Sequence, residues 1–233
     1  MEKRKVLILL FFCAVVFSLH AQMPSLSPKE VQQGWILLFD GKSFDGWQKA
    51  NGQPFTGKGW KIENGVLSVD PTTGRGGDIV TTQKFLDFEL SLDFKLEKGS
   101  NSGVKYNLFE NTSLGSEYQI IDDSQHPDAK LGKDGNRTLA AHYDVLPPSG
   151  NKKAKAVGEW NNLRIVVKGK NVEHWLNGVK VLEFNRESER FQNGVAESKF
   201  KNQKDFAALR PSPILLQEHE DVIHFQNIKI KSL

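Results

Sequence analysis

Residues 87–96 read D-F-E-L-S-L-D-F-K-L and alternate between polar and apolar side chains throughout. Successive side chains of a β-strand point to opposite faces of the sheet, so apolar residues at every second position line one face. This stretch therefore predicts a strand in a sheet that has one buried face and one polar face. The apolar positions are Phe88, Leu90, Leu92, Phe94 and Leu96.

Shorter runs of the same kind lie on both sides of this strand and are separated by Gly, Asn and Asp. Residues 59–69, G-W-K-I-E-N-G-V-L-S-V, predict a hairpin, because an Asn-Gly pair favours a two-residue type I′ turn. Residues 163–184 predict three further strands, and no segment has a 3.6-residue apolar repeat of useful length. Roughly a dozen short strands in one chain indicate an all-β sandwich or jelly roll.

The N-terminus has the pattern of a secretory signal peptide. M-E-K-R-K precedes V-L-I-L-L-F-F-C-A-V-V-F-S-L, an apolar run of about 14 residues that is short for a membrane span of ~20. We expect a signal peptide over residues 1–21, a short N-terminal lead over 22–34 and a single jelly-roll domain over 35–233. This predicts export to the periplasm or exterior of a bacterium, with no span in the mature chain; a retained N-terminal anchor is the alternative.

The composition limits the classes of partner. The single cysteine, Cys13, lies in the expected signal peptide, so a mature chain without disulfides depends on its core, which at this size can bury about 70% of the unfolded surface. Removing Lys3, Arg4 and Lys5 together with Glu2 lowers the formal charge from +3 to +1. This balance does not favour nucleic acid or an anionic membrane as a partner. No feature indicates an oligomeric state.

The segment S-E-Y-Q-I-I-D-D, residues 116–123, is rich in groups that could contact a sugar. Ordinary glycoside hydrolysis needs two carboxyl groups about 5 Å apart for retention or roughly 6.5–9.5 Å apart for inversion. On a strand, Glu117 shares its near face with Gln119, which neither ionises nor attacks. Asp123 would lie about 20 Å further along. The strand therefore does not carry a carboxylate pair by itself.

Polar side chains on neighbouring predicted strands supply further candidates. Alternation pairs Lys105 with Asn107, His142 with Asp144, and Gln217 with His219. If these faces meet in one concavity, their polar side chains converge on Glu117. The alternative is that they form the solvent-exposed side of a sheet that is buried on its other face. His174, before a tight turn, is expected to be structural. The expected catalytic residues are Glu117, His142 and Lys105, and the expected substrate-binding residues are Gln119, Asn107, Gln217, His219 and, from the long connection 185–212, Lys199.

The sequence does not specify a metal site. No H-x-H, H-E-x-x-H or paired-cysteine spacing is present. Glu117 together with His142 or His219 could form a hard-cation site assembled across strands. The metal ligands therefore stay unassigned, and a divalent ion is the one cofactor that the sequence leaves open.

Several motifs occur in the order found in a known family. G-W-I-L-L-F-D-G-K-S-F-D-G-W at residues 34–47 is followed by N-S-G-V-K-Y, E-Y-Q-I-I-D-D, G-E-W-N, H-W-L-N-G and L-L-Q-E-H. From about Trp35 to Leu233 the chain resembles the 3-keto-disaccharide hydrolase domain family. The resemblance implies a concanavalin A-like jelly roll of two antiparallel sheets, able to hold a saccharide. The chain departs from the family pattern at two places. Gln226 stands where the family commonly has arginine, and residues 208–213 stand where a glycine is usual. These departures suggest that the site differs in detail.

The resemblance also implies a chemistry. A ketone at C3 of a sugar acidifies the C2 hydrogen, so that a base can form an enolate, the C1 substituent can leave, and water can add to the double bond. This route needs one base, one electrophile for the enolate oxygen and one acid. Glu117 or a histidine fits the base, and Lys105 or a divalent metal fits the electrophile. The alternatives are a non-catalytic carbohydrate-binding module and an ordinary glycoside hydrolase with carboxylates from different strands.

Overall fold

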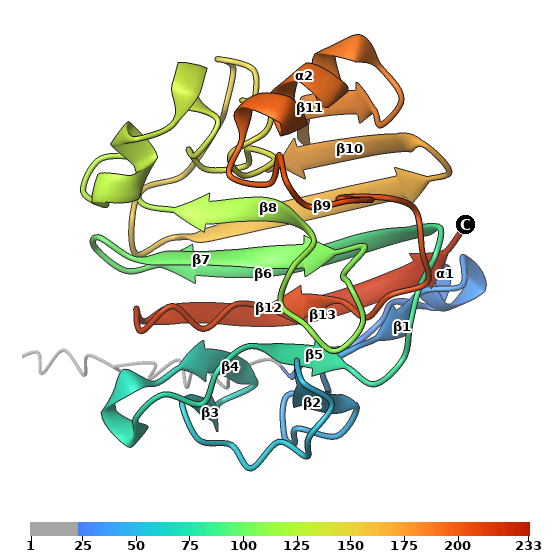
Figure 1. The fold of residues 1–233 in the computed structure, drawn as a ribbon. Helices are drawn as coiled ribbons and strands as arrows, with labels where there is room; N and C mark the ends of the chain where they lie inside the picture. The colour runs from blue at the N-terminus through green and yellow to red at the C-terminus, as the bar shows by residue number, and fades with distance from the viewer. Residues whose placement is uncertain (1–22) are drawn as a thin grey trace, which may run out of the picture.

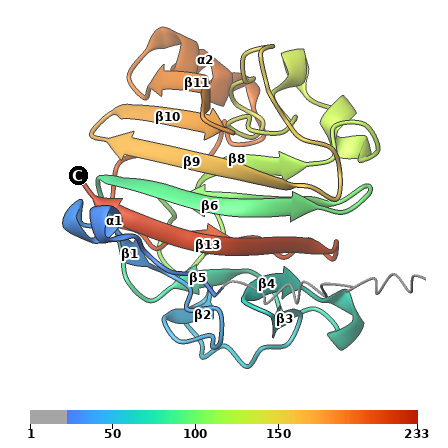
Figure 2. The same cartoon turned by 180° about the vertical axis from the view of Figure 1, so that it is seen from behind.

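Residues 23–233 of the computed structural model form two antiparallel β-sheets packed face to face (Figures 1 and 2). The expected all-β jelly-roll sandwich is confirmed. The expected signal peptide over residues 1–21 lies outside the described residues. The expected lead contains α1 (Pro28–Gln32), a short helix that begins at the capping residue Ser27.

The larger sheet has eight strands and faces the viewer in Figure 2. Its central strand β6 (Phe88–Leu96) is the alternating stretch described above, and it pairs with β9 (Trp160–Lys168) on one side and β13 (Ile223–Ser232) on the other. The short strand β1 (Ile36–Leu37) pairs with the far part of β13. In spatial order the sheet comprises β11 (Val179–Asn185), β10 (Asn171–Leu176), β9 (Trp160–Lys168), β6 (Phe88–Leu96), β13 (Ile223–Ser232), β4 (Val66–Val69) and β3 (Trp60–Glu63).

The smaller sheet has five strands and lies in front in Figure 1. Its inner face packs on the larger sheet, and its outer face carries polar side chains of its last two strands. In spatial order it comprises β2 (Trp47–Lys49), β5 (Ile79–Thr81), β12 (Leu215–Leu216), β7 (Asn101–Tyr106) and β8 (Ser116–Ile121).

The core lies between the two sheets. All five apolar residues of β6 are buried, with exposures of 5% or less, and burying each such side chain contributes ~1.5–3 kcal/mol. Tyr106 and Tyr118 of the smaller sheet face the same core and are fully buried. The hairpin between β3 and β4 turns at Asn64 and Gly65, whose φ angles of 53° and 79° are those that a type I′ turn requires.

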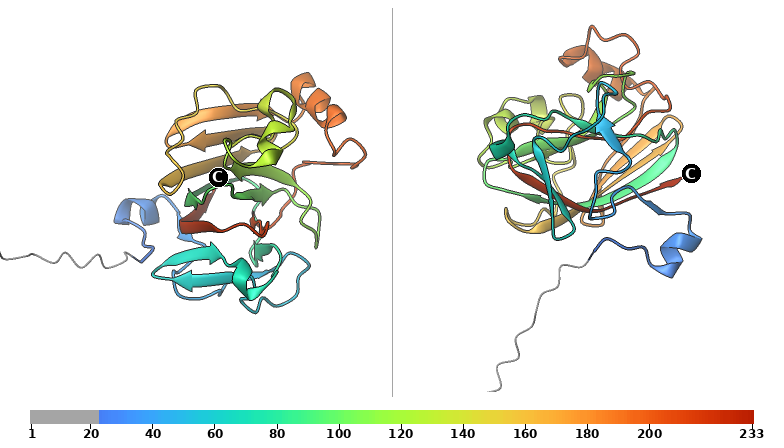
Figure 3. Two further views of the ribbon diagram at one scale, coloured as in Figure 1. Left: turned by 90° about the vertical axis from the view of Figure 1, so that its left-hand side faces the viewer. Right: turned by 90° about the horizontal axis from the view of Figure 1, so that it is seen from below.

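Helices occur in the connections outside the sheets. The helix α2 (Glu189–Glu197) was not expected, because it buries only Phe191 and so shows no apolar repeat. It begins at Ser188, whose hydroxyl accepts from the Phe191 N–H. Figure 3 shows α1 and α2 outside the two sheet layers. Over residues 23–233, no helix is long and apolar enough to cross a membrane. The remaining helical turns are η1 (Pro71–Thr73), η2 (Pro127–Lys130) and η3 (Lys133–Gly135).

An irregular segment extends the smaller sheet beyond β8. The N–H of Ala140 donates to Gln119 O at 2.8 Å, and the N–H of Tyr143 donates to Glu117 O at 3.0 Å. A bridge pairs His142 with Tyr118 across this edge. Since paired residues share a face, His142 turns inward with Tyr118, whereas Tyr143 turns outward with Glu117. This pairing decides which residues of the segment reach the outer face.

Candidate functional site

Lys105 and Glu117 form an ion pair on the outer face of the smaller sheet. They are direct partners in the register of β7 and β8, and Lys105 Nζ lies 3.5 Å from Glu117 Oε2. Both residues are buried, with exposures of 9% and 6%. The structure therefore brings together two of the three residues expected to be catalytic.

Glu117 has an unusual environment for a carboxyl group. Burial raises its pKa above the usual value, and the nearby charge of Asp78 adds to this, while Lys105 and Lys199 act in the opposite direction. The net effect is a raised pKa, so the carboxyl holds its proton to a higher pH than an exposed glutamate. A buried carboxyl with a raised pKa is a candidate for proton transfer in a reaction.

A glycine makes room for this carboxyl. A Cβ atom on Gly103 would lie 2.3 Å from Glu117 Oε1, so the Glu117 side chain lies across β7 in space that any other residue would fill. Gln119 holds the same oxygen: with its amide nitrogen turned toward acceptors, it donates to Glu117 Oε1 at 3.2 Å and to Ser102 O at 3.0 Å. Gly103 lies in the N-S-G-V-K-Y motif, but the sequence alone did not indicate its role.

Two further residues, Gln217 and Asp78, lie on the side of β7 away from β8. The N–H of Gln217 donates to Gly103 O at 3.0 Å, which continues the pairing of β12 with β7 and sets Gln217 next to Gly103. Asp78, just before β5, accepts from the N–H of Glu218 at 2.9 Å. Asp78 is a site residue that sequence reasoning missed, because it follows a Gly-rich turn and not an alternating strand.

Lys199 reaches the site from the long connection 185–212. Its N–H donates to Asp144 Oδ2 at 2.7 Å, and Arg137 Nε donates to Asp144 Oδ1 at 2.7 Å. Its ammonium lies 4.3 Å from the centre of the Tyr143 ring, a cation–π contact. Desolvation lowers the pKa of Lys199 and Lys105 adds to this, while the charge of Glu117 opposes it. Lys199, Arg137 and Asp144 also line a groove of about 690 Å³.

His142 does not reach this face, which corrects the expectation that it is catalytic. It is fully buried, and both ring nitrogens lack hydrogen-bond partners. Its ring is parallel to that of His174, with 6.3 Å between the ring centres, and makes T-shaped contacts with the rings of Phe184 and Phe191. Burial lowers its pKa well below the usual value, with smaller contributions from His174 and Arg186. The reason is the pairing with Tyr118, which turns His142 into the core.

Asn107 does not share the face of Lys105, which corrects a second expectation. Strand β7 ends at Tyr106, and Asn107 has a φ of 50°, so strand alternation no longer applies. The side chain is fully buried; it accepts from Arg186 Nη2, and its Nδ2 donates to Arg210 O at 3.4 Å. His174 is buried, as expected for a structural residue. Its Nε2 lies 2.8 Å from the Tyr106 hydroxyl, and its Nδ1 lies 3.0 Å from Ala140 O.

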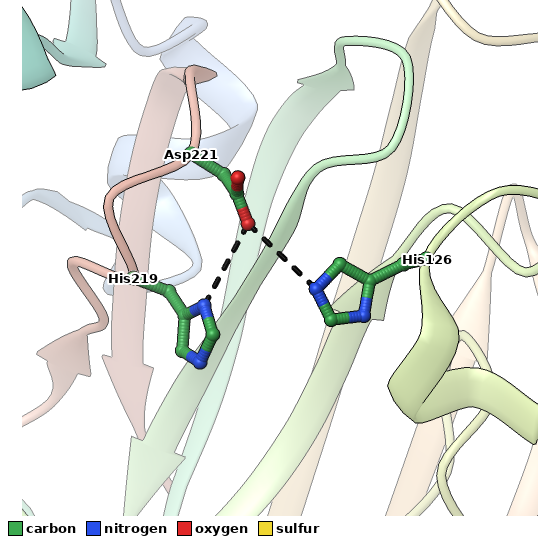
Figure 4. Close-up of side chains that lie close together, drawn as sticks. All are labelled: His126, His219 and Asp221. Carbon is green, nitrogen blue, oxygen red and sulfur yellow. Dashed lines mark ion pairs between the residues drawn. The ribbon is translucent and has the colours of Figure 1, made fainter. Parts of the chain in front are cut away.

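His219 belongs to a second cluster, with His126 and Asp221 (Figure 4). Asp221 Oδ2 accepts from the N–H of Asn101, the first residue of β7, at 3.1 Å. Over residues 23–233 the group of three metal-ligating side chains close enough to share an ion is this one, and Glu117 is not a member. A cation site built from Glu117 and His142 is excluded by the burial of His142 in the core. Sequence reasoning missed His126 and Asp221, which lie in turns.

One of the two sequence departures lies away from this face. Gln226 is part of β13 in the larger sheet, opposite Asp93 in β6. It lines a groove of about 330 Å³ with Asp93 and Asn162. The expectation that Gln226 changes the site is therefore wrong, because the two sheets separate it from Glu117.

Three comparisons relate the chain to known proteins. Residues 34–231 match a family model described as a 3-keto-alpha-glucoside-1,2-lyase-like domain. A 3-keto-disaccharide hydrolase of Bacteroides thetaiotaomicron is 35% identical over 243 residues, covering 91% of this chain and 83% of that protein.

Solved structures give the same picture. A protein of Parabacteroides distasonis, described as a candidate glycosyl hydrolase, superposes with a TM-score of 0.79 and 32% identity over 91% of this chain and 100% of that one. A second protein of that organism, described in the same way, gives a TM-score of 0.68 and 29% identity over 85% and 99%.

Proposed function

The chain belongs to the family of 3-keto-alpha-glucoside-1,2-lyase-like domains, and we propose that it cleaves 3-keto-glycosides by elimination, with Glu117 as the base. It is a hydrolase of the 3-keto-disaccharide family, as the 35% identity to the Bacteroides enzyme shows. The elimination route, the residue roles and the substrate are our proposal. One observation carries it: a single buried carboxyl of raised pKa lies 3.5 Å from Lys105 on the outer face of the smaller sheet and is influenced by the charge of Lys199.

The first step is removal of the C2 proton. Glu117 takes this proton, and the electrons of the C–H bond form an enolate whose oxygen is the former C3 carbonyl. A base works best when its pKa lies near the working pH, and burial moves Glu117 in that direction. Gln119 keeps the carboxyl over Gly103 by donating to Oε1.

The two lysines match the other requirements. Lys105, at 3.5 Å from the Glu117 carboxyl, is placed to balance the charge that moves onto the enolate oxygen. Lys199 has a lowered pKa and lines the adjoining groove, so it suits the proton donor to the leaving oxygen. When the C1–O bond breaks, the enolate electrons form a C1–C2 double bond and the C3 ketone returns. Water then adds at C1 and a proton at C2, which completes a net hydrolysis.

Asp78 favours ordinary glycoside hydrolysis as a second candidate, because its charge reaches Glu117. The Glu117 carboxyl lies over β7 and Asp78 precedes β5, two strands away. Two interstrand spacings separate the carboxyl groups by about 10 Å. This is twice the separation of retaining enzymes and at the upper limit for inverting ones. The geometry therefore favours the elimination route.

The deciding experiment incubates the purified protein in D₂O with a 3-keto-disaccharide and, separately, with the unoxidised parent. We expect cleavage of the keto sugar alone and one deuterium at C2 of the product, corrected for exchange without enzyme. Glu117→Gln should lower kcat by ~10²–10⁴-fold, the usual contribution of a general base. Cleavage of the parent sugar with hydrogen retained at C2 would establish ordinary hydrolysis. Binding of glycans without turnover of either sugar would establish a binding module.

We also propose that the protein is exported. The support is the basic and then apolar N-terminus over residues 1–21. Expression of the full chain in a Gram-negative host, followed by N-terminal sequencing of the periplasmic product, should give a protein that begins at Gln22. Recovery of the intact N-terminus in the membrane fraction would instead indicate a retained anchor.

A further inference from the structure

We propose that His126, His219 and Asp221 bind a divalent transition-metal cation at one end of the sheet face that carries Glu117. The three side chains come from two separate connections. His126 precedes η2, in the long connection after β8, while His219 and Asp221 lie in the turn between β12 and β13. Figure 4 shows both rings directed at the carboxylate of Asp221.

The distances fit an ion better than a direct contact. Asp221 Oδ2 lies 3.6 Å from His219 Nδ1 and 3.9 Å from His126 Nε2. Both separations are too long for hydrogen bonds, which end near ~3.2 Å for N–H to O. A tetrahedral ion with bonds of about 2.0–2.1 Å holds its ligand atoms about 3.4 Å apart. The three groups therefore converge without bonding to one another, around a space of nearly the size that an ion requires.

The donor set indicates the class of ion. Two imidazole nitrogens and one carboxylate oxygen suit Zn²⁺, Mn²⁺, Co²⁺ or Fe²⁺, whereas Ca²⁺ and Mg²⁺ prefer oxygen ligands throughout. Asp221 is held by the N–H of Asn101 at 3.1 Å, a supporting contact of the kind that orients metal ligands. His219 is exposed, so the ion would keep open positions for an outside ligand.

His126 must adjust when the ion binds. Its Nδ1 accepts from the N–H of Asp128 at 3.2 Å, so the ring proton of the neutral form is on Nε2. Binding through Nε2 transfers that proton to Nδ1 and breaks the contact with Asp128. We infer that His219 and Asp221 form the anchoring pair and that His126 completes the site.

The position of the site suggests a use in the reaction, an extension that rests on the proposed function. Asn101, which holds Asp221, is two residues before Gly103, over which the Glu117 carboxyl lies. This spacing is ~7 Å along the strand. In the orientation in which Gln119 donates to Glu117, its amide oxygen faces the side-chain amide of Asn101 at 3.2 Å and connects the two clusters. A sugar with C2 at Glu117 extends past Gly103 toward the ion. The ion would bind another oxygen of the substrate and hold the sugar in position, while Lys105 faces the enolate oxygen from the other side.

Binding is tested first, without reference to activity. Untagged protein, stripped with a chelator, is titrated with Zn²⁺ and with Mn²⁺ by calorimetry. We expect one ion per chain, and a loss of affinity of at least ~100-fold in His219→Ala and in Asp221→Asn, more than supporting residues contribute. The control His224→Ala removes an imidazole 3.3 Å from Glu97 on the larger sheet and should bind as the wild type does.

Folding is checked by thermal unfolding of each ion-free variant. His219 is exposed and asparagine keeps the oxygen that accepts from Asn101, so neither change should lower Tm by more than a few degrees. Absence of binding by the wild type, or unchanged affinity in His219→Ala, overturns the metal site.

A second measurement separates the site from the proposed function. Turnover of a 3-keto-disaccharide is compared before and after chelation and after Mn²⁺ or Zn²⁺ is restored. We expect loss and recovery of kcat in the wild type and no recovery in His219→Ala. Stoichiometric binding without any turnover would overturn the proposed function and leave the metal site standing. Turnover that is unaffected by chelation would overturn the role of the ion and leave the function standing.

Discussion

At the scale of the residue, the site depends on the environment of the Glu117 carboxyl. Glu117 is buried beside Lys105 and occupies space that Gly103 leaves free. The burial that raises its pKa also makes its charged form costly in the folded state. Activity and stability are therefore expected to respond in opposite directions when this side chain is changed.

Glu117→Gln should stabilise the protein at neutral pH. Because the folded-state pKa is raised, the folded protein holds this proton above the pH at which the unfolded chain releases it, so stability falls as pH rises through that window. An amide removes this dependence, and each ~1 kcal/mol raises Tm by ~2–4 °C. Thermal unfolding should show a higher Tm than the wild type at pH 7 and a smaller difference below the unfolded pKa of about 4.5. A lower Tm at pH 7 would contradict this account.

Lys105→Met should move the acidic limb of the pH–rate profile to higher pH. Lys105 lowers the pKa of Glu117, so its removal lets burial raise that pKa further. The base is active when ionised, and kcat/KM should therefore fall at a higher pH than in the wild type. Lys105→Arg keeps a cation and should restore most of the original profile. An unshifted limb in Lys105→Met would mean that another group titrates.

Gly103→Ala should disable the site without unfolding the sheet. The added methyl group would lie 2.3 Å from Glu117 Oε1, so the carboxyl must move. We expect kcat to fall by at least ~100-fold, because misplaced catalytic groups lose most of their effect. The control is Gly150→Ala, where the methyl group would meet nothing within 4 Å. Wild-type kcat in Gly103→Ala would show that Glu117 needs no such space.

At the scale of the element, strand pairing decides which residues reach the site. Segment 139–143 lies along β8, and its bridge from His142 to Tyr118 sends the histidine inward and Tyr143 outward. A one-residue change in register would exchange the two. His142 is thus a core residue with two unpartnered ring nitrogens.

His142→Leu should keep activity and reduce sensitivity to acid. The pKa of His142 is lowered by burial, so the unfolded chain takes up a proton first as pH falls below about 6.5, and stability is lost there. Leucine cannot be protonated, so this loss of stability at low pH disappears. It also removes unsatisfied polar atoms from the core, each of which costs the folded state ~1–3 kcal/mol. Chemical denaturation at pH 7 and pH 5 should show a smaller drop for the variant. A fall in kcat of more than ~10-fold with the fold intact would return His142 to the catalytic residues.

At the scale of the whole molecule, the site is assembled from distant parts of the chain. Figure 1 shows the connection after β8 and the segment around α2 meeting at the same edge of the smaller sheet. Asp144 joins them by accepting from Arg137 Nε and from the N–H of Lys199. The position of Lys199 is thus a property of the folded molecule.

Asp144→Ala should loosen Lys199 and weaken catalysis. Loss of both contacts releases the turn at residues 198–200, so Lys199 is no longer held over Tyr143. We expect kcat/KM to fall by ~10-fold or more and amide hydrogen exchange at residues 198–200 to rise. Asp144→Asn keeps one acceptor oxygen and should show a smaller effect. Unchanged exchange in Asp144→Ala would contradict the positioning role.

Much of the fold was accessible from the sequence, because it rests on local rules. The alternation over residues 88–96 and the Asn64-Gly65 turn predicted β6 and the β3–β4 hairpin as observed. The helix α2 was missed, because a single buried residue leaves no periodic signal. Alternation predicted that Glu117 and Gln119 share a face, and the register of β7 with β8 places Lys105 on that same face.

The sequence by itself determined the sandwich, the family and the strand faces on which Lys105 and Glu117 lie, since strand periodicity and motif order depend on neighbouring residues. Only the tertiary structure decided the rest. It turned His142 inward, bound Asn107 to Arg186, brought Asp78 and Lys199 to Glu117, and gathered His126 with His219 and Asp221. These placements depend on long connections and positive-φ turns, where side-chain direction follows from packing between distant segments and not from local alternation.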